Sequence, residues 1–158
     1  MGIIIRAADY NDYGGICRLA DQLHNVHVAL RPDVFQRSGE YVHRKEVEAF
    51  FQNEHTVIIV AEHSEGGIAG YTVLNIMEPF QPLFRPRVVV DMFQLAVDES
   101  FRGKGIGQLL VARSIDYARQ IGASSLELGV YEDNLPARSF YNNLGFSTLL
   151  RRMEIHLG

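Results

Sequence analysis

Cysteine is almost absent from the sequence, since Cys17 is the only one among 158 residues. A single thiol excludes a disulfide within the chain and fits a reducing compartment. Long hydrophobic runs are missing too: none approaches the ~20 apolar residues of a membrane span. The stretch Met1–Tyr10 does not look like a signal peptide. We therefore expect a cytoplasmic protein that does not bind a membrane.

An excess of basic residues is also missing. The chain has 15 Lys and Arg against 19 Asp and Glu, a formal net charge of −4, which argues against nucleic acid as the main partner. His24 and His27 could share a helical face, but no acidic or cysteine partner completes a metal set nearby. We therefore expect no metal, and the two histidines are either substrate contacts or ordinary, partly exposed residues.

The composition that remains is that of a globular protein, with 47% hydrophobic and 22% charged residues and no repeat or linker. Hydrophobic periodicity predicts one α/β (α+β) domain, residues 1–158, in the order β-α-α-β-β-β-α-β-α-β. The expected strands are about 3–7, 56–62, 68–76, 88–97, 125–130 and 146–157, the last as one long strand or two short ones. The expected helices are about 10–26, 41–52, 106–121 and 134–144.

The most informative stretch is the loop Arg102-Gly103-Lys104-Gly105-Ile106-Gly107, between an apolar strand and an amphipathic helix. Such a junction directs unpaired backbone N–H groups and the positive end of the helix dipole to one place. Glycine has no Cβ, so a large anion can approach the backbone closely. Arg102 and Lys104 add cations suited to a pyrophosphate. The loop predicts a phosphate-bearing ligand, although a plain tight turn would also use these glycines.

No Gly-Lys-Ser or Gly-Lys-Thr closes this loop, so it is not a P-loop. Its pattern Arg-x-x-Gly-x-Gly, after Leu95-Ala96-Val97, resembles the acyl-CoA-binding signature of the GNAT superfamily of N-acetyltransferases. The segment Asn134–Phe146 resembles the family's Asn-x-x-Ala-x-x-x-Tyr-x-x-x-Gly-Phe signature without a gap. The resemblance covers most of the chain, with both signatures in the right order and spacing.

The resemblance implies a mixed central sheet whose fourth and fifth strands splay apart and form a V-shaped cleft for acetyl-CoA. It implies direct transfer of an acetyl group from acetyl-CoA to a primary amine, and it suggests a homodimer through the terminal strands. By this likeness one strand binds the pantetheine arm, the glycine loop binds the pyrophosphate, and an asparagine contacts the cofactor. The implied cofactor-binding residues are Leu95, Ala96, Val97, Arg102, Gly103, Lys104, Gly105, Ile106, Gly107 and Asn134.

Acetyl transfer needs a neutral amine and a proton for the departing thiolate. Tyr141 matches the family's general acid, and a phenol with a reference pKa of about 10 is protonated at neutral pH; its position also suits a core aromatic. Asp91 is the only carboxylate inside the apolar strand, and burial would raise its pKa toward that of a base. Alternatively it faces solvent at a strand end. Alternation places it with Phe93 and Leu95 unless a bulge intervenes.

The sequence does not identify the molecule that accepts the acetyl group. A small amine suits an enclosed pocket, whereas a protein N-terminus or a lysine needs an open groove. The candidate acceptor contacts are His24, His27, Phe35, Phe80 and Phe84, of which the last two lie in a proline-stiffened loop that lines a cleft or only ends a hairpin. A non-catalytic acyl-CoA-binding sensor would not need Tyr141 or Asp91. A nucleotide-binding regulatory domain would leave the Asn134–Phe146 segment unexplained.

Overall fold

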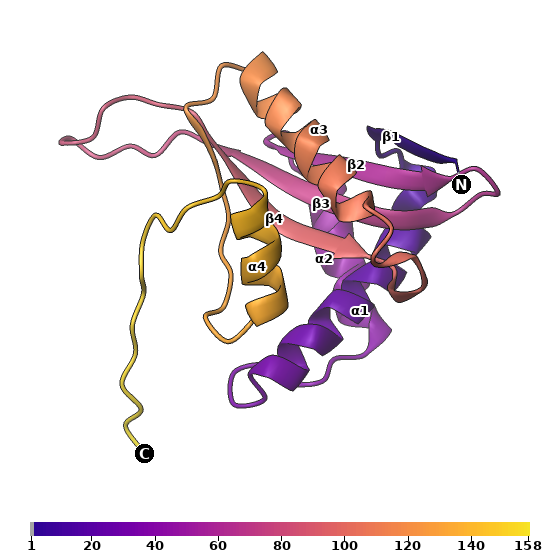
Figure 1. Cartoon of the computed structure of the whole chain (residues 1–158), viewed down its shortest axis with the longest axis horizontal. Helices are drawn as coiled ribbons and strands as arrows, with labels where there is room; N and C mark the ends of the chain where they lie inside the picture. The colour runs from indigo at the N-terminus through magenta and orange to yellow at the C-terminus, as the bar shows by residue number, and fades with distance from the viewer. Residues whose placement is uncertain (1) are drawn as a thin grey trace.

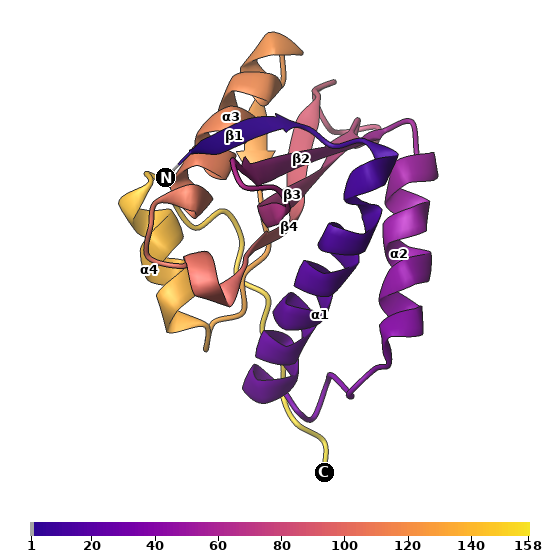
Figure 2. The same cartoon turned by 90° about the vertical axis from the view of Figure 1, so that its right-hand side faces the viewer.

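The structure is a computed structural model that describes residues 2–158, apart from the side chains of residues 40–42. A five-stranded mixed sheet in the order β1-β2-β3-β4-β5 separates two helical layers, with α1 and α2 on one face and α3 on the other (Figures 1 and 2). The strands are β1 (Ile3–Ala7), β2 (Thr56–His63), β3 (Ile68–Met77), β4 (Val89–Val97) and β5 (Ser125–Glu127). The helices are α1 (Tyr13–Leu30), α2 (Glu40–Gln52), α3 (Ile106–Gln120) and α4 (Leu135–Asn143).

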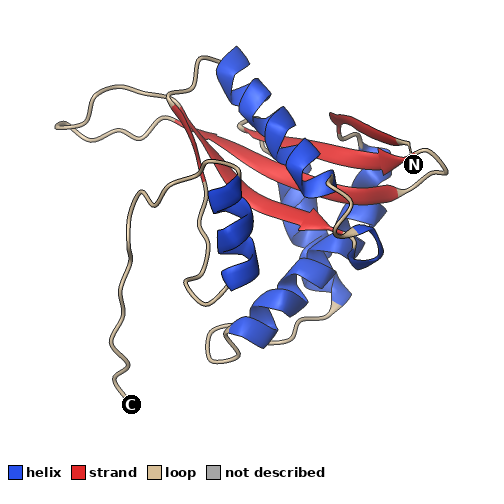
Figure 3. Ribbon diagram, in the orientation of Figure 1, coloured by secondary structure: helices blue, strands red, loops and turns tan. Residues whose placement is uncertain are grey.

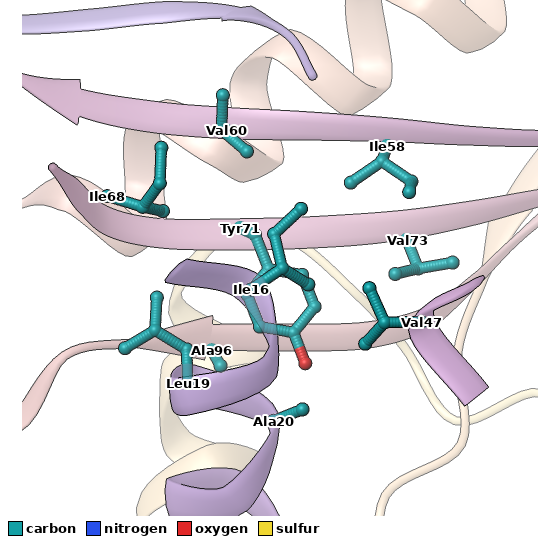
Figure 4. Close-up of a cluster of buried hydrophobic side chains, with 10 residues drawn as sticks. All are labelled: Ile16, Leu19, Ala20, Val47, Ile58, Val60, Ile68, Tyr71, Val73 and Ala96. Atoms are coloured by element: carbon teal, nitrogen blue, oxygen red, sulfur yellow. The ribbon is translucent and has the colours of Figure 1, made fainter. Parts of the chain in front are cut away.

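The sheet has a hydrophobic core on each face, because its central strands alternate between two apolar sets. Toward α1 and α2, a cluster surrounds Tyr71, with Ile16 from α1 and Val47 from α2 (Figure 4). Toward α3, the second cluster includes Leu74 from β3 and Leu110 from α3. The predicted fold class is confirmed. No helix in residues 2–158 is both long and apolar enough to cross a bilayer.

The sheet opens between β4 and β5, the only parallel pair among the strands of residues 2–158. These strands are paired only from Val89 with Ser125 to Asp91 with Glu127. Beyond Asp91, the β4 edge on that side has no strand partner among residues 2–158. The predicted splay is therefore present. It also makes β5 shorter than the expected strand 125–130.

A bulge at Phe93 reverses the faces of β4. Val73 on β3 pairs with Gln94, whereas the next residue, Leu74, pairs with Met92, so Phe93 is an extra residue. Before the bulge Val90 and Met92 face α3; after it Leu95 and Val97 do. Phe93 faces α2, where its ring centroid lies 5.9 Å from that of Phe50. Asp91 shares the face of Phe93 but not that of Leu95, which corrects the simple alternation.

Two expected boundaries differ from the structure. Helix α1 continues to Leu30 instead of ending near Val26, and the N–H of Arg31 still donates to the His27 carbonyl at 2.9 Å. The predicted closing strand over 146–157 is wrong, since these residues form no strand. Instead, residues 147–158, here called the C-terminal arm, extend away from α4 along a separate path (Figures 1 and 3). A strand needs a neighbouring strand to bond to, and the arm has none in the part of the chain that the structure describes.

Candidate active site

The Arg102–Gly107 loop leads directly into α3. Gly103 has φ +73° and Gly105, the N-cap, has φ +81°, conformations that L-residues rarely adopt. No side chain caps this helix, so its first N–H groups point out of the loop without an intrahelical partner. A Cβ added at Gly103 would meet nothing within 4 Å, and one at Gly105 would meet only Gln108 Oε1, at 3.9 Å. The loop therefore presents free donors to open space, as an anion site requires.

Backbone carbonyls of the residues before the loop hold the loop's two cations, Arg102 and Lys104. Arg102 Nε donates to the Val97 carbonyl at 3.1 Å, so one predicted pantetheine-binding group is already paired. Lys104 Nζ donates to the Ser100 carbonyl at 3.1 Å and lies 5.0 Å from the centroid of the Phe101 ring. Both charges thus add positive potential at the loop from fixed positions.

Asp98 anchors the loop to α1, a role that the sequence analysis did not identify. Its carboxylate accepts hydrogen bonds from the Ser100 N–H at 2.9 Å and hydroxyl at 2.6 Å, and it pairs with Arg18. Burial opposes its ionisation, but the bonds from Ser100 and Arg18 outweigh burial and lower the pKa of Asp98 to about 2. A cavity of about 360 Å³ lies between α1 and this turn, lined by Gln22, Asn25, Val26, Ala29, Glu99 and Arg102.

Helix α4 docks on the start of α3. A Cβ on Gly107 would lie 3.1 Å from Phe140 Cζ and 3.8 Å from Val97 Cγ2, so glycine is needed for this close contact. The two sequence signatures therefore meet in space. Tyr141, next to Phe140, belongs to the same apolar cluster as Leu95 and Val97.

The Tyr141 ring is fixed by its neighbours, with centroids 5.1 Å from Phe140 and 5.5 Å from Phe146. Burial raises the pKa of Tyr141 to about 12, so the phenol keeps its proton. Within residues 2–158 its hydroxyl has no hydrogen-bond partner. The side chain is thus both a core aromatic and an available proton donor.

Asp91 lies at the point where β4 and β5 separate. It is aligned with Asn75 on β3 and with Glu127 on β5. Burial, and then the negative charge of Glu127, raise the pKa of Asp91. Glu127 itself accepts from the Ser125 hydroxyl at 2.9 Å and from Arg87 at 3.4 Å. Two carboxylates therefore lie side by side where β4 and β5 separate, and the affinity of Asp91 for a proton is raised.

The glycine loop, the splayed parallel strand pair and the half-buried Tyr141 are the features on which a GNAT site would rest. The model of the acetyltransferase (GNAT) family matches residues 20–146. The chain belongs to the GNAT family of acetyltransferases.

Curated relatives of this GNAT protein match over part of their length. A mycothiol acetyltransferase from Thermobifida fusca is 29% identical over 107 residues, 68% of this chain and 33% of that protein. A streptothricin acetyltransferase from Streptomyces lavendulae is 32% identical over 88 residues, 56% of this chain and 43% of that protein. The matches thus span less than half of each of these relatives.

Solved GNAT-like structures match over nearly the whole chain. A tetramutant of BH1408 from Bacillus halodurans has a TM-score of 0.92 and 33% identity, covering 98% of this chain and 99% of that one. The aminoglycoside N-acetyltransferase AAC(6')-Iy in complex with CoA has a TM-score of 0.77 and 19% identity, covering 98% and 94%. The second likeness is one of fold, and the fold in that case holds CoA, in agreement with the predicted cofactor.

In this GNAT protein, three of the five predicted acceptor contacts lie together: His24, His27 and Phe35. The His27 ring stacks on Phe35 with centroids 5.3 Å apart, and His24 meets Phe35 edge-on at 6.1 Å. Tyr131, from the loop between β5 and α4, completes this aromatic cluster at 5.7 Å from Phe35. Burial, and then His24, lower the pKa of His27, which keeps that imidazole neutral. Tyr131 escaped the sequence analysis because nothing local links it to α1.

The other two candidates, Phe80 and Phe84, lie elsewhere. They sit on the loop between β3 and β4, which projects beyond the sheet, and they are 89% and 49% exposed (Figure 1). This loop adjoins Val89, the end at which β4 and β5 are paired, whereas the sheet opens toward Val97. The structure therefore does not bring them to the cleft, and a hairpin end is the better description of the loop.

Asn134 occupies a structural position in this GNAT fold. It is the N-cap of α4, and its Oδ1 accepts the Ala137 N–H at 3.3 Å. Its cofactor contact stays a prediction that would use the remaining amide group. Asp98, Glu127 and Tyr131 are the site residues that the sequence analysis missed.

Proposed function

We propose that this protein is an acetyl-CoA-dependent N-acetyltransferase that transfers an acetyl group directly to a primary amine. The observation that carries the proposal is the contact between Gly107 and Phe140, which joins the open glycine loop to the helix of Tyr141. Membership of the GNAT family, and relatives named as acetyltransferases of mycothiol and streptothricin, support acetyl transfer.

The residues fit coenzyme A. Backbone N–H groups of the Arg102–Gly107 loop would bind its pyrophosphate, because they point to open space and the loop carries two cations. The edge of β4 from Met92 to Ala96, which has no strand partner among residues 2–158, would hydrogen-bond the pantetheine arm as an added strand does. The Val97 carbonyl would join it only after release from Arg102. Acetyl-CoA supplies the activated acetyl group as a thioester. AAC(6')-Iy, which shares the fold, has been solved with CoA.

The residues of this chain would handle two protons. Asp91, with its raised pKa, would accept the proton that the acceptor amine loses as its nitrogen forms the new bond to the acetyl carbon. Tyr141 would donate its phenolic proton to the departing sulfur and would regain one afterwards. One proton leaves the amine and one reaches the thiolate, so the exchange balances without a redox step.

Direct transfer is favoured over a cysteine-linked intermediate. Cys17 lies on α1 and packs against the core cluster around Tyr71. Burial raises the pKa of this thiol, so little reactive thiolate forms at neutral pH. The aromatic cluster of His27, Phe35 and Tyr131 spans the space between α1 and the loop before α4, which favours a small amine over a peptide acceptor.

Calorimetric titration with acetyl-CoA, CoA and ATP tests the proposal, followed by thiol release with a panel of small amines and peptides. We expect acetyl-CoA and CoA to bind, ATP not to bind, and thiol release to require a small amine. Binding of ATP but not CoA would favour a nucleotide-binding domain. CoA binding with no release by any acceptor would favour the sensor function, and release by peptides alone would favour a peptide acetyltransferase.

The pH dependence of turnover should identify the base. In the wild type, the rate should fall as the pH drops through the raised pKa of Asp91, because the protonated carboxyl can no longer accept a proton. Asp91→Asn should lower the rate and flatten this acidic limb. Glu127→Gln should move the limb to lower pH, because removing a neighbouring negative charge lowers the pKa of Asp91. An identical limb in all three proteins would assign the base elsewhere.

A further inference from the structure

Glu46 on α2 is a carboxylate that the proposed mechanism does not use. It lies over Gln94, the residue after the bulge in β4, whose Nε2 donates to Glu46 Oε1 at 3.1 Å. The hydroxyl of the fully buried Tyr71 donates to the other end of the same amide, Gln94 Oε1, at 2.8 Å. Turning the amide over would place its oxygen against the carboxylate, so the network permits one orientation. Glu46 is therefore held at a fixed place beside the part of β4 that is not paired with β5.

The second oxygen of Glu46 is not used by Gln94. This oxygen, Oε2, lies 3.8 Å from His43 Nδ1, which is too far for a hydrogen bond. His43 is only 4% exposed, and its Nδ1 is buried without a hydrogen-bond partner among residues 2–158. Buried polar atoms that lack a partner are rare in folded proteins. The carboxylate and the imidazole therefore form a polar pair that a further group could complete.

The candidate acceptor contacts reach the same place. The ring of His24, one of these contacts, lies 5.3 Å from that of His43, centroid to centroid. At the opposite ring nitrogen, Nε2 of His43 lies 3.2 Å from the hydroxyl of Ser38 and 3.5 Å from the carboxylate of Asp21. Ser38 and Asp21 also line a cavity of about 440 Å³ beside α1. Through His43, Glu46 thus adjoins the surface to which the acceptor is assigned.

An open aromatic ring, that of Phe93, separates Asp91 from Glu46. Phe93 is 52% exposed although it lies within a strand, and its ring meets that of Phe50 on α2. Phe50 follows Glu46 by four residues, so both side chains lie on the face of α2 that meets β4. Asp91 precedes Phe93 by two residues and shares its face of the sheet. In order along β4, the surface thus presents a carboxylate, an exposed ring and a second carboxylate.

We propose that Glu46 selects acceptors with a second cationic group, a specificity that rests on the proposed function. The reacting amine lies at Asp91, the second ammonium group donates to Glu46 Oε2 in a charge-assisted hydrogen bond, and the carbon chain between them crosses the Phe93 ring. Asp91 and Gln94 are three positions apart, so at ~3.3 Å per residue the two ends lie about 10 Å apart, less what the bulge removes. Short aliphatic diamines therefore fit this surface better than monoamines.

Thiol release with matched amines tests this specificity. Butylamine and putrescine have the same carbon chain and differ by one amino group, as do pentylamine and cadaverine. In the wild type, kcat/KM per amino group should be at least about tenfold higher for the diamine of each pair, as a charge-assisted contact gives. Glu46→Gln should bring this ratio close to one, because the amide keeps the hydrogen bond from Gln94 and loses the charge. Glu48→Gln changes an exposed carboxylate on the same helix and should keep the wild-type ratio.

Calorimetric titration with the same four amines, in the presence and absence of CoA, gives a readout that does not need turnover. Each diamine should bind the wild type more tightly than its monoamine, and Glu46→Gln should remove the difference. If the diamines bind in this way but none is acetylated, the site for the second cation stands and the proposed transferase function fails. Equal behaviour of the two members of each pair in the wild type, in binding and in turnover, would overturn the specificity. A preference that Glu46→Gln retains would belong to another residue and would overturn it as well.

Discussion

Replacing Gly105 with valine should abolish acetyl-CoA binding and leave the protein folded. The space next to Gly105 is free of protein apart from Gln108 Oε1 at 3.9 Å, so a branched side chain would occupy the volume assigned to the pyrophosphate. The positive φ of +81° adds backbone strain of about 1–2 kcal/mol, less than the stability of a typical domain. Calorimetric titration and thermal unfolding measure the two effects separately.

Gly122→Val is the matched control for this change. Gly122 has a similar φ of +72°, has nothing within 4 Å of its added Cβ, and lies just beyond the far end of α3. The Gly122→Val variant should lose about as much stability as Gly105→Val does and should keep the affinity of the wild type for acetyl-CoA. If Gly105→Val retained that affinity, the glycine loop would be a tight turn and nothing more.

Tyr141→Phe should lower kcat by about 10²–10⁴-fold, the range for a lost general acid, with little change in acetyl-CoA affinity. The ring keeps its packing on Phe140 and Phe146, and the lost hydroxyl has no partner within residues 2–158, so stability should hardly change. Stopped assays of thiol release, with calorimetry on the same samples, separate turnover from binding.

Tyr117→Phe removes the same hydroxyl near the other end of α3 and should behave as the wild type. Because the pKa of Tyr141 is about 12, its ionisation should not reduce the rate at neutral or mildly alkaline pH. Unchanged turnover in Tyr141→Phe would leave this residue as a core aromatic and would remove it from the mechanism.

The glycine loop and the α4 segment could be predicted because their signals are local. Positive φ at Gly103 and Gly105, and the cap and first turn of α4, follow from residues that are neighbours in sequence. The splay between β4 and β5 came from family resemblance and could not have come from hydrophobic pattern alone.

Features that depend on pairing between strands far apart in the chain could not be predicted from the sequence. The position of Glu127 beside Asp91 follows from a parallel register, which is set by the whole sheet. The prediction of a closing strand over residues 146–157 was wrong for a related reason. Alternating apolar residues identify a segment that can pair, but they do not show that a strand edge lies within its reach.

Because Phe93 is an extra residue, the odd-numbered side chains of β4 lie on one face of the sheet before it and on the other face after it. Before Phe93, Asp91 lies where β4 and β5 separate. After it, Leu95 and Val97 pack in the core toward α3, although they are odd-numbered like Asp91. Removing one residue here would leave a continuous ladder but turn one half of the strand inside out, sending polar groups into the core. A point substitution in β4 keeps this register, so the other residues of the strand keep the faces they have.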